Sequence, residues 1–219
     1  MTTKRELFGI LFAVGGINFK QEGPVQFGIG QSLNNLKGDT DVIRIGMTSL
    51  VPNTKNEAGI SKGGSFGEKY IVRYAFIQFH GFVNNNVAKE VDLKEEEIMT
   101  MLTAMWNGTD ELNTTSKFGQ KSRLLVKVNY KDNGYIGDLD LMAKLEQKEE
   151  LLENITQVKL KLDNLLELIE SNKDIIESVE YEHNPTLLCA YRDNDGRDFE
   201  HIITEWSKDS KIPVMRLKL

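Results

Sequence analysis

The sequence predicts an α+β protein with a ferredoxin-like C-terminal portion, and three patterns support this fold class. Segments rich in β-branched and aromatic residues occupy the first third of the 219-residue chain. A single amphipathic segment with a helix-start signal follows them near residue 92. From about residue 155 onward, strand and helix patterns take the order β-α-β-β-α-β, which is the order of elements in the ferredoxin-like fold.

The first strands are predicted by short apolar segments. Leu7–Val14 is apolar throughout, which predicts a buried strand, and Val25–Ser32 and Val42–Leu50 predict two more. Pro52–Gly67 is rich in Gly, Ser and Asn, and a loop of this length is usually functional or disordered. Tyr70–Phe82 is apolar on both faces, so we expect a strand that is covered on both sides.

The predicted helix covers residues 92–107 and has a start signal, an end signal and a buried face. Asp92 stands at the capping position, and Glu95, the first of three glutamates, stands where a capping box needs it. Gly108 is placed to end the helix. The face predicted to be buried consists of Ile98, Leu102, Met105 and Trp106.

A polar loop leads from this helix into a strand at Leu124–Tyr130, whose residues alternate between two faces. The loop carries basic and amide side chains, namely Lys117, Gln120, Lys121 and Arg123. Such side chains on a loop held between a helix and a strand suit contacts with a phosphate backbone. The alternative is a solvated connection on an ordinary sheet domain.

The C-terminal pattern consists of four strands and two helices. The strands are predicted at Gln157–Leu162, Glu177–His183, Thr186–Tyr191 and Pro213–Leu219, and the helices at Asp163–Ser171 and Asp198–Lys208. The chain is therefore expected to divide into a strand-rich portion (1–140), a charged helix or linker (141–156) and the ferredoxin-like portion (157–219).

The net charge of −6 argues against a protein that coats nucleic acid indiscriminately. The charge is uneven, however: residues 1–92 carry 10 Lys/Arg against 8 Asp/Glu, and residues 93–219 carry 17 against 25. A local cationic surface is therefore compatible with the negative net charge of the whole chain. The only cysteine, Cys189, fits a reducing cytoplasm, and the apolar run Leu7–Ile17 is too short to span a bilayer.

Scans for catalytic and ligand-binding motifs find no catalytic site, no cofactor site and no metal site. A dinucleotide fingerprint starting at Gly28 lacks its third glycine, and Ser65 stands where a P-loop needs lysine. Asp138 and Asp140 are interpreted as a surface turn. The histidines are far apart in the sequence and lack the spacing of metal ligands: His80, His183 and His201. We therefore expect a protein that is not an enzyme.

What remains is a set of basic, amide and aromatic side chains in predicted loops and strand ends. Amines on a glycine-bearing arm can meet phosphates while an aromatic ring stacks on a base. The candidate RNA-binding residues are Gln26, Lys55, Lys62, Phe66, Lys69, Arg73, Lys117, Gln120, Lys121 and Arg123.

Several stretches of the sequence, taken together, are also typical of one protein family. They are Leu7–Gly9, Gly23–Leu33, Gly64–Tyr74, Phe79–Asn84, Trp106–Tyr130 and Gly137–Leu139, together with the C-terminal region. In this combination the chain resembles the Cas7-type backbone subunit, a member of the RAMP superfamily, that binds crRNA in the type I-B CRISPR complex Cascade. The strongest likeness lies in Trp106–Tyr130.

The resemblance implies a right-hand-like subunit with an RRM-like palm, an antiparallel sheet and an extended thumb-like hairpin. Copies would stack along the guide RNA, with Pro52–Tyr70 as the thumb and with Gln26 and the Lys117–Arg123 loop near RNA or a neighbouring subunit. The implied partners are guide RNA, other backbone subunits and the large subunit, with self-association along RNA and no membrane. The implied function is non-catalytic and cytoplasmic.

One departure from the family leaves two functional classes open. Family members usually begin with an additional strand, a glycine-bearing loop and a basic helix, whereas Met1–Glu6 leads almost directly into a segment normally found well inside the protein. A subunit with a shortened N-terminus is favoured by the Lys/Arg loops. A truncated mimic that docks on Cascade components and blocks assembly, as an anti-CRISPR decoy does, is favoured by the net acidity and the short N-terminus. An unrelated ferredoxin-like regulator is a third interpretation.

Overall fold

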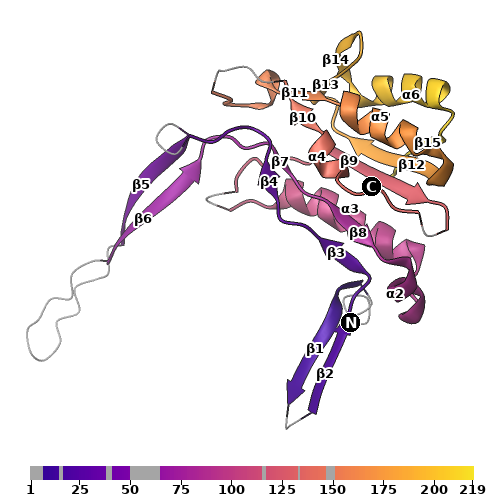
Figure 1. The fold of residues 1–219 in the computed structure, drawn as a ribbon. Coiled ribbons are helices and arrows are strands. Elements are labelled where there is room, and N and C mark those ends of the chain that lie inside the picture. Colours follow the sequence, from indigo (N-terminus) through magenta and orange to yellow (C-terminus); the bar gives the residue numbers. More distant parts are fainter. Residues whose placement is uncertain are drawn as a thin grey trace, which may run out of the picture.

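The computed structural model describes residues 7–14, 17–37, 41–49, 65–114, 117–132, 134–146 and 151–219. The molecule has the outline of an arch, with a mixed α/β body and two hairpin arms that project from it (Figure 1). This confirms the predicted α+β class, built here from several small sheets. None of the helices within the described ranges is both long and apolar enough to cross a membrane.

The first arm is the antiparallel hairpin of β1 (Gly9–Val14) and β2 (Ile17–Glu22). The strand predicted within Leu7–Val14 is confirmed over Gly9–Val14, but its predicted burial is wrong, because Leu11 on this arm is 76% exposed. Among the residues of this segment whose burial is described, 7–11, Leu7 at the root of the arm is the buried one; it lies in a small cluster with Val25 and Met101. The segment is apolar although it projects from the body.

Glycines set the root of this arm. Gly9 has a left-handed φ of +77°, and a Cβ atom there would lie 2.2 Å from the backbone oxygen of Gln21. At Gly23 a Cβ atom would lie 2.3 Å from the carbonyl carbon of Phe8. The two chain segments therefore cross at a distance that only glycine permits.

A narrow ribbon connects the two arms (Figure 1). It consists of two short antiparallel pairs, β3 (Val25–Phe27) with β8 (Gly81–Val83) and β4 (Gln31–Ser32) with β7 (Ile77–Gln78). Tyr70–Phe82 was predicted as one strand covered on both sides, and this is wrong in two respects. The segment is broken into three strands, and its large side chains are exposed at Tyr70, Ile77, Phe79 and Phe82.

The second arm is the antiparallel hairpin of β5 (Val42–Ser49) and β6 (Ser65–Val72), paired from Val42↔Val72 to Ser49↔Ser65. The predicted strand at Val42–Leu50 is confirmed in all but its last residue. Of the predicted loop Pro52–Gly67, residues 52–64 lie outside the described residues, and residues 65–67 belong to β6.

The main helix, α3, spans Glu95–Glu111, so it begins and ends later than predicted. Asp92 is not its cap, since its φ is +55° and it lies in the turn after the short helix α2 (Asn85–Glu90). The carboxylate of Glu97 instead accepts the N–H of Lys94 at 3.1 Å. Gly108 lies inside the helix rather than after it. The face predicted to be buried is half-buried, and the one fully buried residue of α3 is its neighbour Met101.

The C-terminal elements follow the predicted order closely. They are β11 (Lys159–Lys161), α5 (Asp163–Ser171), β12 (Ile176–His183), β13 (Leu188–Tyr191), α6 (Phe199–Ser210) and β15 (Val214–Arg216), with β14 (Asn194–Asp198) added before α6. Short helical turns lie at Ile155–Gln157 and Lys173–Ile175. Of the expected linker, the described part contains the end of α4 (Leu139–Met142) and β10 (Lys144–Leu145).

These strands lie in two sheets, whereas a ferredoxin-like fold has one. One sheet has the order β10-β11-β13-β14, with β11 and β13 parallel, and the other has the order β15-β12-β9, with β12 and β15 parallel. β9 (Leu124–Tyr130) pairs antiparallel with β12 over the whole of its length. A strand from outside the C-terminal pattern thus occupies the edge of β12 where β13 would otherwise pair.

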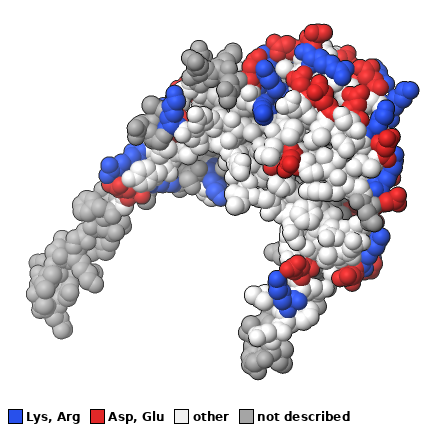
Figure 2. Space-filling model, viewed as in Figure 1, with Lys and Arg blue, Asp and Glu red and all other residues white. Residues whose placement is uncertain are grey.

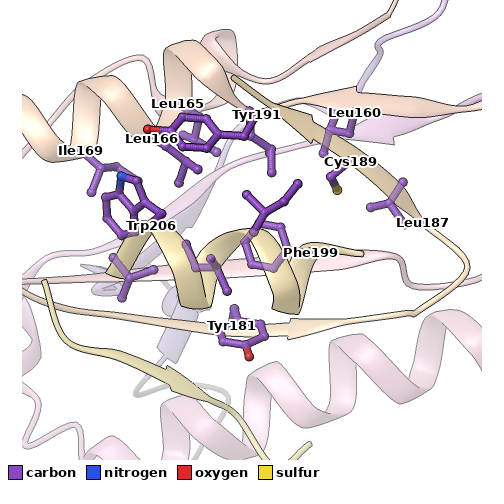
Figure 3. Close-up of a cluster of buried hydrophobic side chains, with 14 of the residues drawn as sticks. Leu160, Leu165, Leu166, Ile169, Tyr181, Leu187, Cys189, Tyr191, Phe199 and Trp206 are labelled. Carbon is purple, nitrogen blue, oxygen red and sulfur yellow. The ribbon is translucent and has the colours of Figure 1, made fainter. Parts of the chain in front are cut away.

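The main core lies between the two sheets and the helices α5 and α6 (Figure 3). Four residues of α6, spaced i, i+3, i+4 and i+7, are at most 1% exposed: Phe199, Ile202, Ile203 and Trp206. The Tyr181 ring of β12 lies 5.3 Å from that of Phe199, measured between centroids. This core supports β9, and therefore the loop that precedes β9.

Cys189 lies in this core, and burial together with the charge of Asp198 raises the pKa of its thiol from 9.0 to about 12. Because the unfolded thiol ionises more easily than the folded one, stability should fall as the pH rises from about 9 toward 12. Urea unfolding at several pH values should show this decline, and Cys189→Ala should show a shallower one. At pH 8 a thiol reagent should react only as fast as the protein unfolds; fast reaction would mean an accessible thiol.

Candidate nucleic-acid interface

The loop between α3 and β9 is fastened to the last turn of α3. The carboxylate of Asp110 accepts the N–H of Ser122 at 2.7 Å and pairs with the ammonium of Lys121 at 3.1 Å. The Ser122 hydroxyl donates to the backbone oxygen of Trp106 at 2.8 Å. Lys121, which was predicted to bind RNA, therefore has an anionic partner in Asp110 and helps to position the loop.

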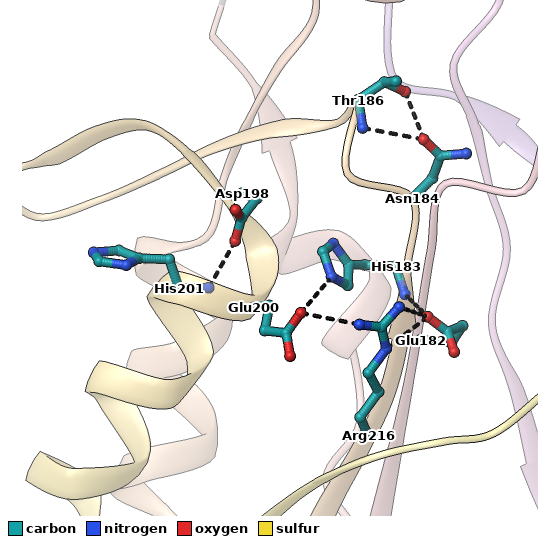
Figure 4. Close-up of polar contacts among 8 residues, drawn as sticks. All are labelled: Glu182, His183, Asn184, Thr186, Asp198, Glu200, His201 and Arg216. Atoms are coloured by element: carbon teal, nitrogen blue, oxygen red, sulfur yellow. Dashed lines mark hydrogen bonds and ion pairs between the residues drawn. The ribbon is translucent and has the colours of Figure 1, made fainter.

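The end of the loop is fastened to the turn between β12 and β13. Arg123 Nη1 donates to the hydroxyl of Thr186 at 2.5 Å, and the N–H of Asn184 donates to the backbone oxygen of Arg123 at 2.9 Å. Thr186 is itself held by the side chain of Asn184, whose oxygen accepts from its N–H and its hydroxyl (Figure 4). Arg123 is thus fixed by contacts on both its side chain and its backbone.

The loop meets the foot of the β5–β6 arm. Burial raises the pKa of the Tyr74 hydroxyl, and the positive charge of Arg123 acts on the same group in the opposite direction. Arg73 precedes Tyr74, is exposed, and donates its N–H to the backbone oxygen of Asp41 at 2.8 Å. We call Arg73, Tyr74 and the loop 117–123, which approaches Tyr74 through Arg123, the inner corner.

The arm itself carries charge on both of its faces. Lys69 is half-buried and lies opposite Ile45, on the face that also carries Ile43 and Ile71. Arg44 lies on the other face, where it pairs with Glu68. Lys69 makes no ion pair with any residue that the structure describes. Its side chain therefore brings an unneutralised charge to a mainly apolar face.

The structure brings together only part of the predicted set. The residues of the inner corner are Arg73, Lys117, Gln120, Lys121 and Arg123. Gln26 is exposed on β3, opposite Phe82, and no described contact joins it to that corner. Lys55 and Lys62 lie outside the described residues, as does the side chain of Phe66, so their placement as RNA contacts stays a prediction.

Several exposed aromatic side chains are absent from the predicted set, which contains Phe66 as its aromatic residue; Phe8, Phe27, Phe79 and Phe118 are among them. Phe118 is 84% exposed, within the loop that carries Lys117 and Gln120. Phe8, Phe27 and Phe79 form an exposed chain of rings along the ribbon, with centroids 6.4 and 6.0 Å apart. An aromatic residue between a lysine and a glycine was the signal available for Phe118, whereas nothing local marks the other three as neighbours.

Charge is distributed unevenly over the face shown in Figure 2. Acidic side chains gather over the top of the body, among the C-terminal helices and strands, and Lys or Arg side chains lie near the region where the β5–β6 arm joins the body. On this face, acidic side chains of the C-terminal part therefore lie over the top of the body, with Lys and Arg side chains among them.

A second polar cluster lies on the body, and its members bind one another (Figure 4). Arg216 donates to Glu182 at 2.9 and 3.1 Å and to Glu200 at 3.0 Å, and His183 Nε2 lies 3.2 Å from Glu200. These contacts tie the last strand to β12 and α6, which is a structural role. Elsewhere Asp140 pairs with His80 at 2.9 Å, and no group of potential metal ligands is found among the described residues.

Comparison with known proteins supplies the family. The family model of CRISPR-associated protein Cas7 matches residues 5–163. This chain belongs to the Cas7 family. The match includes both arms, the ribbon, α3 and the inner corner, and it ends at the start of α5.

A relative of this Cas7-family chain, "CRISPR-associated protein Cas7" from Haloferax volcanii, is 28% identical over 161 residues. The alignment covers 72% of this chain and 46% of the relative, so the chain spans about half of that protein's length. The resemblance to a Cas7-type CRISPR subunit, which is strongest in Trp106–Tyr130, is thus confirmed.

Proposed function

We propose that this Cas7-family chain is a non-catalytic backbone subunit of a type I-B Cascade complex, which binds guide RNA at the inner corner. The observation that carries this proposal is that the Lys117–Arg123 loop approaches Tyr74, the residue after Arg73, through Arg123, beside the foot of a projecting arm. Phosphate contacts come from cations on several elements whose relative positions are fixed. They set the position of the protein on the nucleic acid but do not read the base sequence.

The local charges support this use of the corner despite the net charge of −6. Lys117 and Arg73 are exposed, and neither makes an ion pair with any residue in the described ranges. They are therefore available to neutralise phosphates. Lys121 and Arg123 have partners already, so we assign them mainly to holding the loop in place.

The remaining parts of the proposal follow the family. The body would act as the RRM-like palm, the β5–β6 hairpin as a thumb that folds over the strand, and exposed apolar residues of the ribbon as contacts to neighbouring backbone subunits or the large subunit in the cytoplasm. The exposure of Phe8, Phe27 and Phe79 supports a surface that a further molecule covers.

A second candidate function is a mimic that docks on Cascade components and blocks their assembly. The observation that favours it is the combination of net acidity with apolar residues exposed on the β1–β2 arm and on the ribbon, such as Leu11 and Ile29. A surface of this kind can bind protein without binding nucleic acid.

Binding of the purified chain to a single-stranded RNA across a salt series distinguishes the two functions. A guide-binding subunit should lose affinity by about 0.7 log units per phosphate contact for each log unit of salt. No binding at low salt, together with stable binding to a Cas7-family backbone subunit, would contradict the first function and support the mimic.

A further inference from the structure

Phe118 presents its ring to solvent in a way that few apolar residues of the described chain do. It is 84% exposed, and among the described large hydrophobic residues only Ile29 is more exposed, at 87%. A hydrophobic ring gains nothing from water, since burying it would stabilise the protein. Single exposed hydrophobic residues are common on protein surfaces, so the meaning of this ring depends on the residues around it.

The backbone around Phe118 is held in place. The N–H of Lys117 donates to the oxygen of Thr114 at 3.1 Å, and Gly119 turns the chain with a φ of +78°. On the other side, Asp110 holds Ser122 at 2.7 Å. The ring is thus presented by a turn with anchors on both sides, and a ligand would meet it in a preformed position.

The neighbours of Phe118 indicate the chemistry of that ligand. Lys117 and Gln120 are exposed beside it, and Arg73 lies at the same corner. A protein-binding anchor is normally surrounded by further apolar side chains, whereas a lone ring between cations and amides matches a nucleotide, with a flat base and a charged phosphate.

We propose that Phe118 is a base-stacking residue, which restricts the inner corner to nucleic acid with unpaired bases. The face of a base is accessible to an aromatic ring only when the base is not stacked within a duplex. This inference rests on the proposed function and adds a residue that contacts a base, beside residues that contact phosphates. Asp110 is the positioning residue for the ring.

The test compares Phe118→Ala and Phe118→Leu with the wild-type protein, each binding an oligouridylate and an RNA duplex of the same length. Both variants should bind the single strand about 5- to 150-fold more weakly, because stacking on one base contributes about 1–3 kcal/mol. Leucine is the matched control for apolarity, since it keeps a hydrophobic side chain but has no flat face. Affinity for the duplex should stay within about twofold.

Two further readouts separate stacking from the charge contacts. The slope of affinity against salt should be unchanged in Phe118→Ala, because no charge is removed. In Phe118→Trp the added indole fluorescence should be quenched by the single strand, above the background of the two native tryptophans, and Asp110→Asn in that variant should weaken the quenching.

The outcomes are distinguishable from those of the proposed function. If the wild-type chain binds no RNA at any salt concentration, the function and the stacking role both fail. If the chain binds RNA with a salt slope and Phe118→Ala or Phe118→Leu binds the single strand as the wild type does, only the stacking role is overturned. Equal losses for the single strand and the duplex would also overturn it.

Discussion

Replacing Lys69, Arg73 and Lys117 together with glutamine should lower the affinity for single-stranded RNA about 50-fold at about 0.15 M salt, if each contacts one phosphate. These side chains are exposed or half-buried, and none has an ionic partner among the described residues. Glutamine keeps much of the side-chain stem, so packing along the arm is largely preserved. Anisotropy titrations should show the salt slope falling by about 2.

The matched control removes three cations from the part of the body away from the arms: Lys173, Lys208 and Lys211. Both triple variants change the net charge from −6 by three units, to −9. The control should bind RNA within about threefold of the wild type, since charges beyond a Debye length of about 10 Å are largely screened. An equal loss in both variants would mean that total charge, and not the inner corner, determines binding.

Replacing Trp206 with alanine should cost about 3–5 kcal/mol, a large share of the roughly 5–15 kcal/mol that stabilises a domain. Trp206 is 1% exposed and lies on the face of α6 that fills the main core (Figure 3). Its removal leaves a cavity between helices and sheets that cannot collapse freely. Urea unfolding should give a lower midpoint with an unchanged slope.

Two variants sharpen this prediction. The indole Nε1 of Trp206 is buried and has no hydrogen-bond partner among the described residues, and an unpaired buried donor costs about 1–3 kcal/mol. Trp206→Phe removes that donor and keeps a ring, so it should be about 2 kcal/mol more stable than Trp206→Ala. Lys208→Ala, on the exposed face of α6, should change stability by less than about 0.5 kcal/mol. Equal losses of stability in Trp206→Phe and Trp206→Ala would contradict the view that the ring of Trp206 fills the core.

The C-terminal elements could be predicted because their signals are local. The spacing of Phe199, Ile202, Ile203 and Trp206 defines one helical face, and β9 alternates as a strand should. Which strands pair depends on residues far apart: β9 joins β12 across about fifty residues, and no local pattern reports that. The predicted strands therefore form two sheets in the structure, whereas the ferredoxin-like prediction placed them in one.

For the arms and for the start of α3, clear local patterns led to wrong predictions. Leu7–Val14 has the composition of a buried strand, yet Gly9–Val14 lies on a projecting arm where Leu11 is exposed. Composition alone does not show whether an apolar side chain packs against its own chain. The cap of α3 was misplaced for another reason. Asp92 is a good capping residue, but its φ of +55° is not the extended conformation that a cap adopts, and the helix begins three residues later, at Glu95.

At the inner corner, residue types could be predicted but their partners could not. Lys117 and Arg123 were recognised as basic residues in a loop, whereas the partners that fix the loop lie 11 residues away, for Lys121 with Asp110, and 63 residues away, for Arg123 with Thr186. Only the coordinates show that Lys121 and Arg123 are engaged while Lys117 is available. Phe118 was missed because motif scans weigh charge in loops and ignore an isolated ring.

The crossing of Gly9 and Gly23 determines how the β1–β2 arm can vary. Backbone atoms of the two segments are in close contact there. The direction of the arm is therefore set by main-chain atoms, and not by side chains that mutation can exchange. Adding or deleting cross-strand pairs farther along the hairpin would change its reach by about 3.4 Å per pair and leave its direction untouched. The length of the arm can thus vary independently of the direction in which it leaves the body.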